Sequence, residues 1–157
     1  MKKLLATNPQ SNTALIARIA LGVVLFPHGA QKLLGWFGGY GFDGTMGFLT
    51  GGAGLPYIIA LLVILIEFFG ALFLIFGFST RLAAIGVIGN FIGVVATSHI
   101  NNGFFMNWSG QQQGEGFEYH LLALAIAVAI MIMGSGKWSI DSMLQKKTSE
   151  PKYHKVA

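Results

Sequence analysis

The sequence predicts an all-α integral membrane protein, a bundle of four transmembrane helices. Of its 157 residues, 54% are hydrophobic and only 10% are charged, whereas a soluble domain carries about 25% charged residues. Mean hydropathy is +0.63. Crossing a hydrocarbon core of about 30 Å takes about 20 helical residues, and four apolar segments are long enough. They are residues 14–35, 56–78, 81–100 and 118–135.

The first span, 14–35, carries a polar stripe in an otherwise apolar run. At about 100° per residue, five of its residues share one face, which should contact the other helices. These residues are Arg18, Gly22, Leu25, Gly29 and Lys32. His28 lies beside this stripe, and Pro27 lacks the N–H of a regular helix, so a bend is expected there. The next segment, 36–55, is rich in glycine and predicts an outer loop with a short interfacial helix.

Glu67 and Asn90 are the polar residues deepest in the second and third spans. Small neighbours surround each of them, which indicates that both face the bundle interior. Both lie about ten residues from a helix end, so we expect them to meet. The sequence then predicts a cavity with His28 and Lys32 in its wall and Glu67 at its floor. In the third span, Gly89 and Gly93 are interpreted as a site of close helix approach.

The fourth span begins with two titratable residues on different faces. Glu118 shares a face with Ala125 and Ala129, and His120 is about 200° away. We therefore expect Glu118 to point inward and His120 to lie at the membrane interface. His99, at the end of the third span, is also interpreted as interfacial.

These assignments define two sets of candidate residues. The predicted ligand-binding set is His28, Lys32, Glu67, Asn90 and Glu118, and the structural or ion-pair set is Arg18, Gly29, His99 and His120. A structural alternative stays open for each polar side chain: a cation near a helix end can extend to the interface, and a buried carboxyl can simply bond a neighbouring amide. No spacing typical of a metal site, nucleophile with base, or nucleic-acid site is found, so no metal or catalytic residue is assigned.

The distribution of cations predicts the topology. Four spans place successive tails and loops alternately on the two sides of the membrane, and only Lys32 falls on the side of the two long loops. The other nine cations fall on the side of the termini: Lys2, Lys3, Arg18, Arg81, Lys137, Lys146, Lys147, Lys152 and Lys155. By the positive-inside rule both termini are cytoplasmic. The predicted organisation is a cytoplasmic tail at 1–13, a transmembrane domain at 14–142 and a basic cytoplasmic tail at 143–157.

Several blocks of the sequence resemble the DoxX family of small bacterial inner-membrane proteins. The similar blocks are RIALGVVLFPHGAQKL, IEFFGALFLIFGFSTRLAA, HINNGFFMNW, GFEYHLLAL and GSGKWSID, spread over residues 14–142. The resemblance implies a four-helix bundle in the inner membrane. It places the family's first-helix Arg, His-Gly and Lys on Arg18, His28, Gly29 and Lys32, its membrane Glu on Glu67, and its last block on Gly134 to Asp141.

The resemblance also implies association with quinone-linked oxidoreductases. The leading hypothesis is a quinone- or electron-transfer-linked subunit of a membrane oxidoreductase complex, with a quinone as the candidate cofactor. Its expected partners are the lipid bilayer, a membrane or soluble oxidoreductase, and further copies of the chain. Two alternatives stay open: a small-solute transporter or channel, and a non-catalytic scaffold for a redox or sulfur-handling enzyme.

Overall fold

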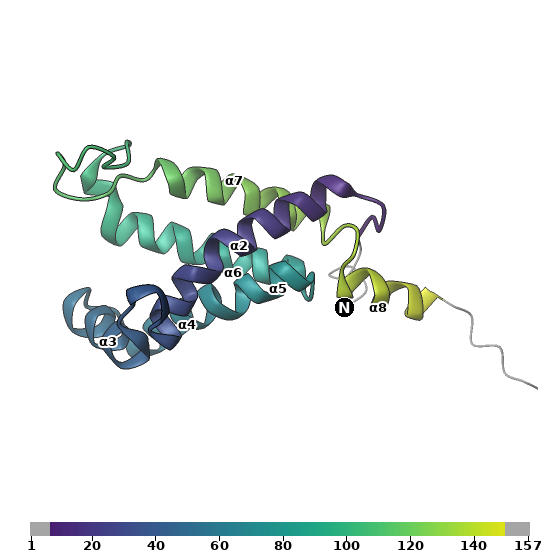
Figure 1. The fold of residues 1–157 in the computed structure, drawn as a ribbon, viewed down its shortest axis with the longest axis horizontal. Helices are drawn as coiled ribbons and strands as arrows, with labels where there is room; N and C mark the ends of the chain where they lie inside the picture. Colours follow the sequence, from purple (N-terminus) through teal and green to yellow (C-terminus); the bar gives the residue numbers. More distant parts are fainter. Residues whose placement is uncertain (1–6, 150–157) are drawn as a thin grey trace, which may run out of the picture.

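The computed structural model describes residues 7–149, and every regular element within that range is a helix. The first is α2 (Asn12–Leu34), followed by α4 (Tyr57–Leu65), α5 (Ala71–Phe76), α6 (Thr80–Val94), α7 (Glu118–Met133) and α8 (Ile140–Ser149) (Figure 1). Short turns extend two of them. The π-helical turn η3 (Ile66–Gly70) joins α4 to α5, and η4 (Val95–His99) and η5 (Ile100–Asn102) continue α6.

Three helices are long and apolar enough to cross a membrane. They are Asn12–Leu34, Tyr57–Phe76 and Thr80–Asn102, of 23, 20 and 23 residues. The first continues through Pro27 as one α-helix. The fourth apolar helix, α7, has 16 residues, about 24 Å at 1.5 Å per residue. The predicted helical membrane bundle is therefore confirmed with three full spans and a shorter fourth helix.

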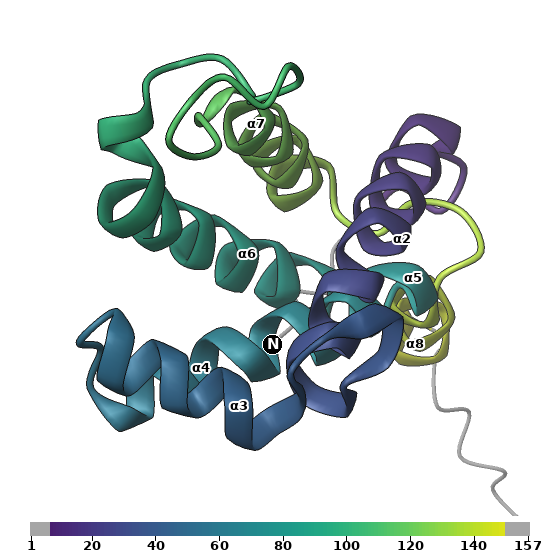
Figure 2. The same cartoon turned by 60° about the vertical axis from the view of Figure 1, so that its left-hand side comes forward.

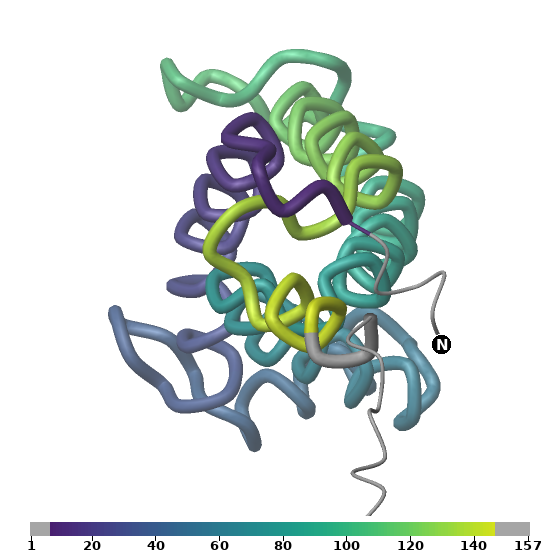
Figure 3. Tube along the Cα trace, turned by 90° about the vertical axis from the view of Figure 1, so that its right-hand side faces the viewer, coloured from purple at the N-terminus to yellow at the C-terminus, as the bar shows by residue number. Residues whose placement is uncertain are grey.

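The helices surround a main apolar core, and a smaller apolar cluster of Met46, Ala60 and Ile64 lies between α3 (Gly41–Gly47) and α4. α2 contacts α5, η3 and α7, and α6 contacts α7; viewed from the α8 end, these elements encircle a common centre (Figure 3). Leucine and alanine fill that centre, including Leu21, Leu25, Leu74 and Ala127. The outward faces are equally apolar, with Ile16, Val23, Leu62, Phe69, Leu82, Ile92, Leu122 and Ile132 exposed. Such a surface suits lipid and would be unfavourable in water.

The two ends of the bundle differ in structure. The terminal end holds the start of α2, the turn at 77–79, and residues 134–149 (Figure 1). The loop end holds residues 36–55 and 95–117. The first of these segments contains η1 (Trp36–Gly38), α3 (Gly41–Gly47) and η2 (Phe48–Gly52), so the predicted Gly-rich loop includes short helices. Figure 2 shows it beside α4, away from the second loop segment, which caps α7.

Arg18 holds the terminal end together from inside. Its guanidinium is 1% exposed and donates hydrogen bonds to five backbone carbonyls. The acceptors are Leu74 O (3.0 Å), Ile75 O (2.5 Å), Ser135 O (2.8 Å), Lys137 O (3.0 Å) and Trp138 O (2.6 Å). All five N–H donors of the fork are thereby used. The side chain joins α2, the end of α5 and the segment before α8.

Asp141 connects α8 to the start of α6. Its carboxylate accepts from Ser79 N at 2.8 Å and Thr80 N at 2.9 Å, two of the backbone donors that a helix N-terminus leaves unpaired. Much of the predicted tail at 143–157 is thus ordered as helix α8, up to Ser149. Residues 1–6 and 150–157 of the two predicted tails lie outside the described range.

Candidate functional site

A buried network of three polar side chains lies midway along the second membrane-spanning helix. Glu67, on η3, is 5% exposed. Its Oε2 lies 2.5 Å from Lys32 Nζ of α2, and its Oε1 accepts a hydrogen bond from Asn90 Nδ2 of α6 at 3.1 Å. Three helices therefore meet at one carboxylate, and the predicted meeting of Glu67 with Asn90 is observed.

Gly29 allows this network to form. A Cβ at Gly29 would lie 2.5 Å from the backbone of Phe68 and 2.6 Å from the carbonyl carbon of Glu67. Only glycine permits so close an approach of α2 to η3. Lys32, three residues further along α2, then lies within reach of the Glu67 carboxylate. The π-helical turn at Ile66–Gly70 coincides with this contact, as such turns often do at functional sites.

A cavity of about 470 Å³ opens from the network towards the loop end. Its polar lining residues are His28, Lys32, Glu67, Ser98, His99, Glu115, Tyr119 and His120. Leucine, valine, methionine and phenylalanine side chains form the remaining wall. Ligand sites in proteins have this composition and fall between about 300 and 1,000 Å³.

Aromatic rings gather on the α6 and α7 side of the cavity. The His120 ring lies 4.3 Å from that of His99 and 5.4 Å from that of Phe91, measured between centroids. His120 is 7% exposed. Within the described part of the chain, neither its Nδ1 nor the buried hydroxyl of Tyr119 has a hydrogen-bond partner. Buried polar atoms are almost always paired, so these two atoms are suited to contacting a ligand.

His28 and His99 take different positions around the same cavity. His28 lines it from α2, one turn before Lys32, with its side chain exposed. His99 ends η4, and its Nδ1 lies 2.7 Å from the carbonyl oxygen of Glu115. This contact joins the end of the third span to the loop that leads to α7. His99 therefore belongs to the cavity wall as well as to the helix end.

The predicted orientation of the fourth helix is wrong. Glu118 does not line the cavity; its Oε1 accepts from Met106 N at 3.0 Å and Trp108 Nε1 at 3.3 Å, and so holds the loop segment 95–117. His120 faces inward instead. Alanines occur on both faces of α7, so small residues alone did not distinguish them. The spacing of the buried set, His120, Ala123, Ala127 and Ile130, was the available signal, because these positions fall on one helical stripe.

Tyr119 was not among the predicted site residues. Its side chain is half-buried, and its ring packs 6.2 Å from that of Phe91. A tyrosine at the start of a membrane helix is typical of the interfacial aromatic belt. Its sequence position therefore gave no indication that it lines the cavity. Arg18, by contrast, lies at the terminal end and outside the cavity.

The fold and the cavity together define a helical membrane protein with a polar site between its spans. The DoxX family model matches residues 13–100, and the chain belongs to the DoxX family. It is 30% identical over 108 residues to "Putative oxidoreductase CatD" of Bacillus subtilis, covering 69% of this chain and 70% of that one. It is also 30% identical over 133 residues to "Inner membrane protein YqjF" of Escherichia coli, covering 85% and 92%. No solved structure matches significantly. The protein is a multi-pass protein of the bacterial inner membrane.

Proposed function

We propose that this protein binds a quinone in the polar cavity and acts as a membrane subunit of an oxidoreductase complex. The observation that carries the proposal is the Lys32–Glu67–Asn90 network at the floor of an aromatic-walled cavity. A quinone needs an apolar slot for its ring, hydrogen-bond donors for its two oxygens, and groups that exchange protons when it is reduced.

The cavity residues match these requirements one by one. Lys32, the Tyr119 hydroxyl and His120 can donate to quinone oxygens, and the edge-to-face pair of Phe91 and His120 offers an aromatic wall against which a planar head group can pack. Glu67 and the histidines can carry the two protons that accompany two-electron reduction. The electrons would come from a partner oxidoreductase. The Bacillus subtilis relative is named "Putative oxidoreductase CatD", which is consistent with this assignment.

We further propose that the terminal end faces the cytoplasm and that the cavity opens towards the periplasm. The described cations at the terminal end include Arg81, Lys137 and Lys146, whereas Lys32 lies at the cavity. Such a bias follows the positive-inside rule. The short helices of the Gly-rich loop, with exposed Trp36 and Tyr40, would then lie at the periplasmic membrane surface.

Quinone binding can be measured directly on the purified protein. Equilibrium dialysis with the tail-free dimethoxy-methyl-benzoquinone head group should give a saturable site. Glu67→Gln and His28→Ala should each weaken binding about tenfold, equivalent to about 1.4 kcal/mol. Asp43→Asn is the matched control, because Asp43 is exposed on α3 and lies outside the cavity.

The alternatives give different outcomes. A solute channel would show flux in vesicles that Glu67→Gln abolishes, without saturable quinone binding. A scaffold would lose stability in the charge-neutral variants while the turnover of the assembled complex stayed unchanged. Wild-type protein that fails to bind the head group, or variants that bind it equally well, would contradict the proposal.

A further inference from the structure

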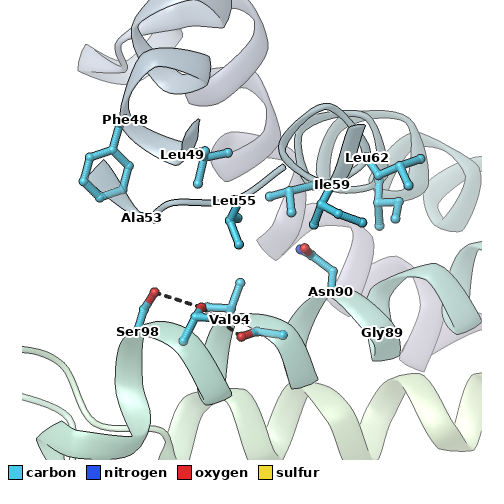
Figure 4. A pocket seen from close by; sticks show the side chains of 14 residues that line it. Phe48, Leu49, Ala53, Leu55, Ile59, Leu62, Gly89, Asn90, Val94 and Ser98 are labelled. Atoms are coloured by element: carbon cyan, nitrogen blue, oxygen red, sulfur yellow. Dashed lines mark hydrogen bonds between the residues drawn. The ribbon is translucent and has the colours of Figure 1, made fainter. Parts of the chain in front are cut away.

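A second cavity, of about 240 Å³, opens as an apolar groove between the second and third spans (Figure 4). Leu49 and Leu55 of the first loop segment lie on one side of it, Ile59 and Leu62 of α4 line another, and Gly89 and Val94 of α6 face them. Both helices are membrane spans. The groove therefore runs alongside both spans, from the first loop segment inwards to Asn90.

Two glycines of α6 leave the groove open. A Cβ at Gly89 or Gly93 would have nothing within 4 Å. The predicted close helix approach at these glycines is therefore wrong within this chain. Gly89 and Gly93 leave open space between α6 and α4, whereas Gly29 lets α2 pack directly against η3.

The groove adjoins the polar cavity. Five residues line both hollows: Phe48, Leu49, Val63, Val94 and Ser98. Asn90 stands where they meet: its Nδ2 bonds Glu67, which lines the cavity, and its side chain points into the space between α6 and α4 (Figure 4). Asn90 is 7% exposed, and its buried Oδ1 has no partner among residues 7–149. The groove thus has mostly apolar walls, the hydroxyl residues Thr97 and Ser98 at its loop end, and one unpaired acceptor, Asn90 Oδ1, at its inner end.

We infer that this groove holds the isoprenoid tail of the quinone whose head group occupies the polar cavity. The inference rests on the proposed function. The tail lies along the leucine, isoleucine and glycine surface, and Asn90 Oδ1 accepts a hydrogen bond from a hydroxyl of the reduced head group where the groove meets the polar cavity. A quinone then moves between the bilayer and the site through the side of the protein, without crossing water.

Depth favours this occupant over a phospholipid chain. Thr97 and Ser98 line the loop end of the groove, and Asn90 lines its inner end, where it bonds Glu67 in the middle of the span Tyr57–Phe76. A phospholipid keeps its charged head at the membrane surface, whereas a quinone head is small and neutral enough to lie within the bilayer.

The test compares two probes on detergent-solubilised full-length protein. One is the tail-free dimethoxy-methyl-benzoquinone, and the other is the same head group bearing two isoprene units. Gly89→Leu and Gly93→Leu fill the groove. Gly47→Leu is the matched control, because a Cβ at Gly47 also meets nothing within 4 Å and Gly47 lines neither hollow. The ratio of variant to wild-type affinity removes any effect of probe partition into detergent.

We expect Gly89→Leu and Gly93→Leu to weaken binding of the tailed probe at least tenfold. Binding of the tail-free probe should weaken less than twofold. Gly47→Leu should change neither. Equal effects on both probes, or none on either, would overturn it while leaving quinone binding established. Loss of a copurifying phospholipid or of a dimer in the leucine variants, without loss of tailed-probe affinity, would assign the groove to that occupant. Wild-type protein that binds neither probe would overturn the proposed function itself.

Discussion

Lys32 and Glu67, 35 positions apart in the chain, form an ion pair of 2.5 Å between two membrane-spanning helices. The carboxylate is almost fully buried, whereas 30% of the lysine side chain is exposed. A charge in such a place is stable only with a partner and further hydrogen bonds, and Asn90 supplies one of them. Lys32 also lines a separate hollow of about 670 Å³ beneath the Gly-rich loop. Lys32 therefore lines both that hollow and the polar cavity.

Removing Lys32 should destabilise the fold more than removing Glu67. Lys32→Met leaves the buried Glu67 carboxylate without its cation and should lower the free energy of unfolding by about 3 kcal/mol. Glu67→Gln should lower it less, because the lysine can turn to its exposed side. The double variant Lys32→Met/Glu67→Gln should recover most of the loss, measured by denaturant unfolding in detergent micelles.

Lys146→Met serves as the control for this cycle. Lys146 is exposed on α8, so its replacement should change the free energy of unfolding by less than about 0.5 kcal/mol. Strictly additive effects of the two single substitutions would show that the pair contributes no coupling.

Helical periodicity and depth were enough to predict which polar side chains of the first three spans come together. Glu67 and Asn90 meet because their distances from the helix ends match, and Arg18 and Gly29 are buried on the predicted stripe. The register of α7 was not predictable from alanine positions, since both faces carry them. The open space at Gly89 and Gly93 depends on how far α4 and α6 diverge, which no local pattern encodes.

Gly29→Ala should be among the most damaging single substitutions in the chain. The added methyl group would meet the Phe68 backbone at 2.5 Å, and a backbone cannot move aside as a flexible side chain does. We expect a loss of about 2–3 kcal/mol in the free energy of unfolding. Gly93→Ala, where the methyl group meets open space, should be neutral or stabilise by up to about 1 kcal/mol. Similar losses for both variants would contradict the close approach of α2 to η3.

Arg18→Lys should not preserve the function of Arg18 at the terminal end. Lysine has three donors where the guanidinium has five, and five carbonyls accept from Arg18. At least two acceptors would lose their bond, lowering the free energy of unfolding by about 3 kcal/mol. Lys146→Arg, the reverse change at an exposed site, should have little effect. If Arg18→Lys were as stable as the wild type, the five hydrogen bonds of Arg18 would not be what holds the terminal end together.

The proposed topology can be tested with single cysteines, because the chain contains none. Ser109 is exposed at the loop end, and Met143 is 70% exposed on α8. A membrane-impermeant maleimide should label Ser109→Cys in intact spheroplasts, and Met143→Cys only after lysis. The reverse pattern would place both described ends of the chain in the periplasm.

His120→Phe should separate binding from stability. Phenylalanine keeps the ring that packs on Phe91 and removes the unpaired buried Nδ1. Because an unpaired buried polar atom is unfavourable, the free energy of unfolding should stay the same or rise by about 1–2 kcal/mol. Affinity for the tail-free head group should nevertheless fall about tenfold, equivalent to about 1.4 kcal/mol. Glu118→Gln is the control: Glu118 lies two residues away, its carboxylate bonds Met106 and Trp108 of the loop segment 95–117, and it does not line the cavity, so quinone affinity should be unchanged. Weaker binding in Glu118→Gln with normal binding in His120→Phe would mean that the other face of α7 serves the site.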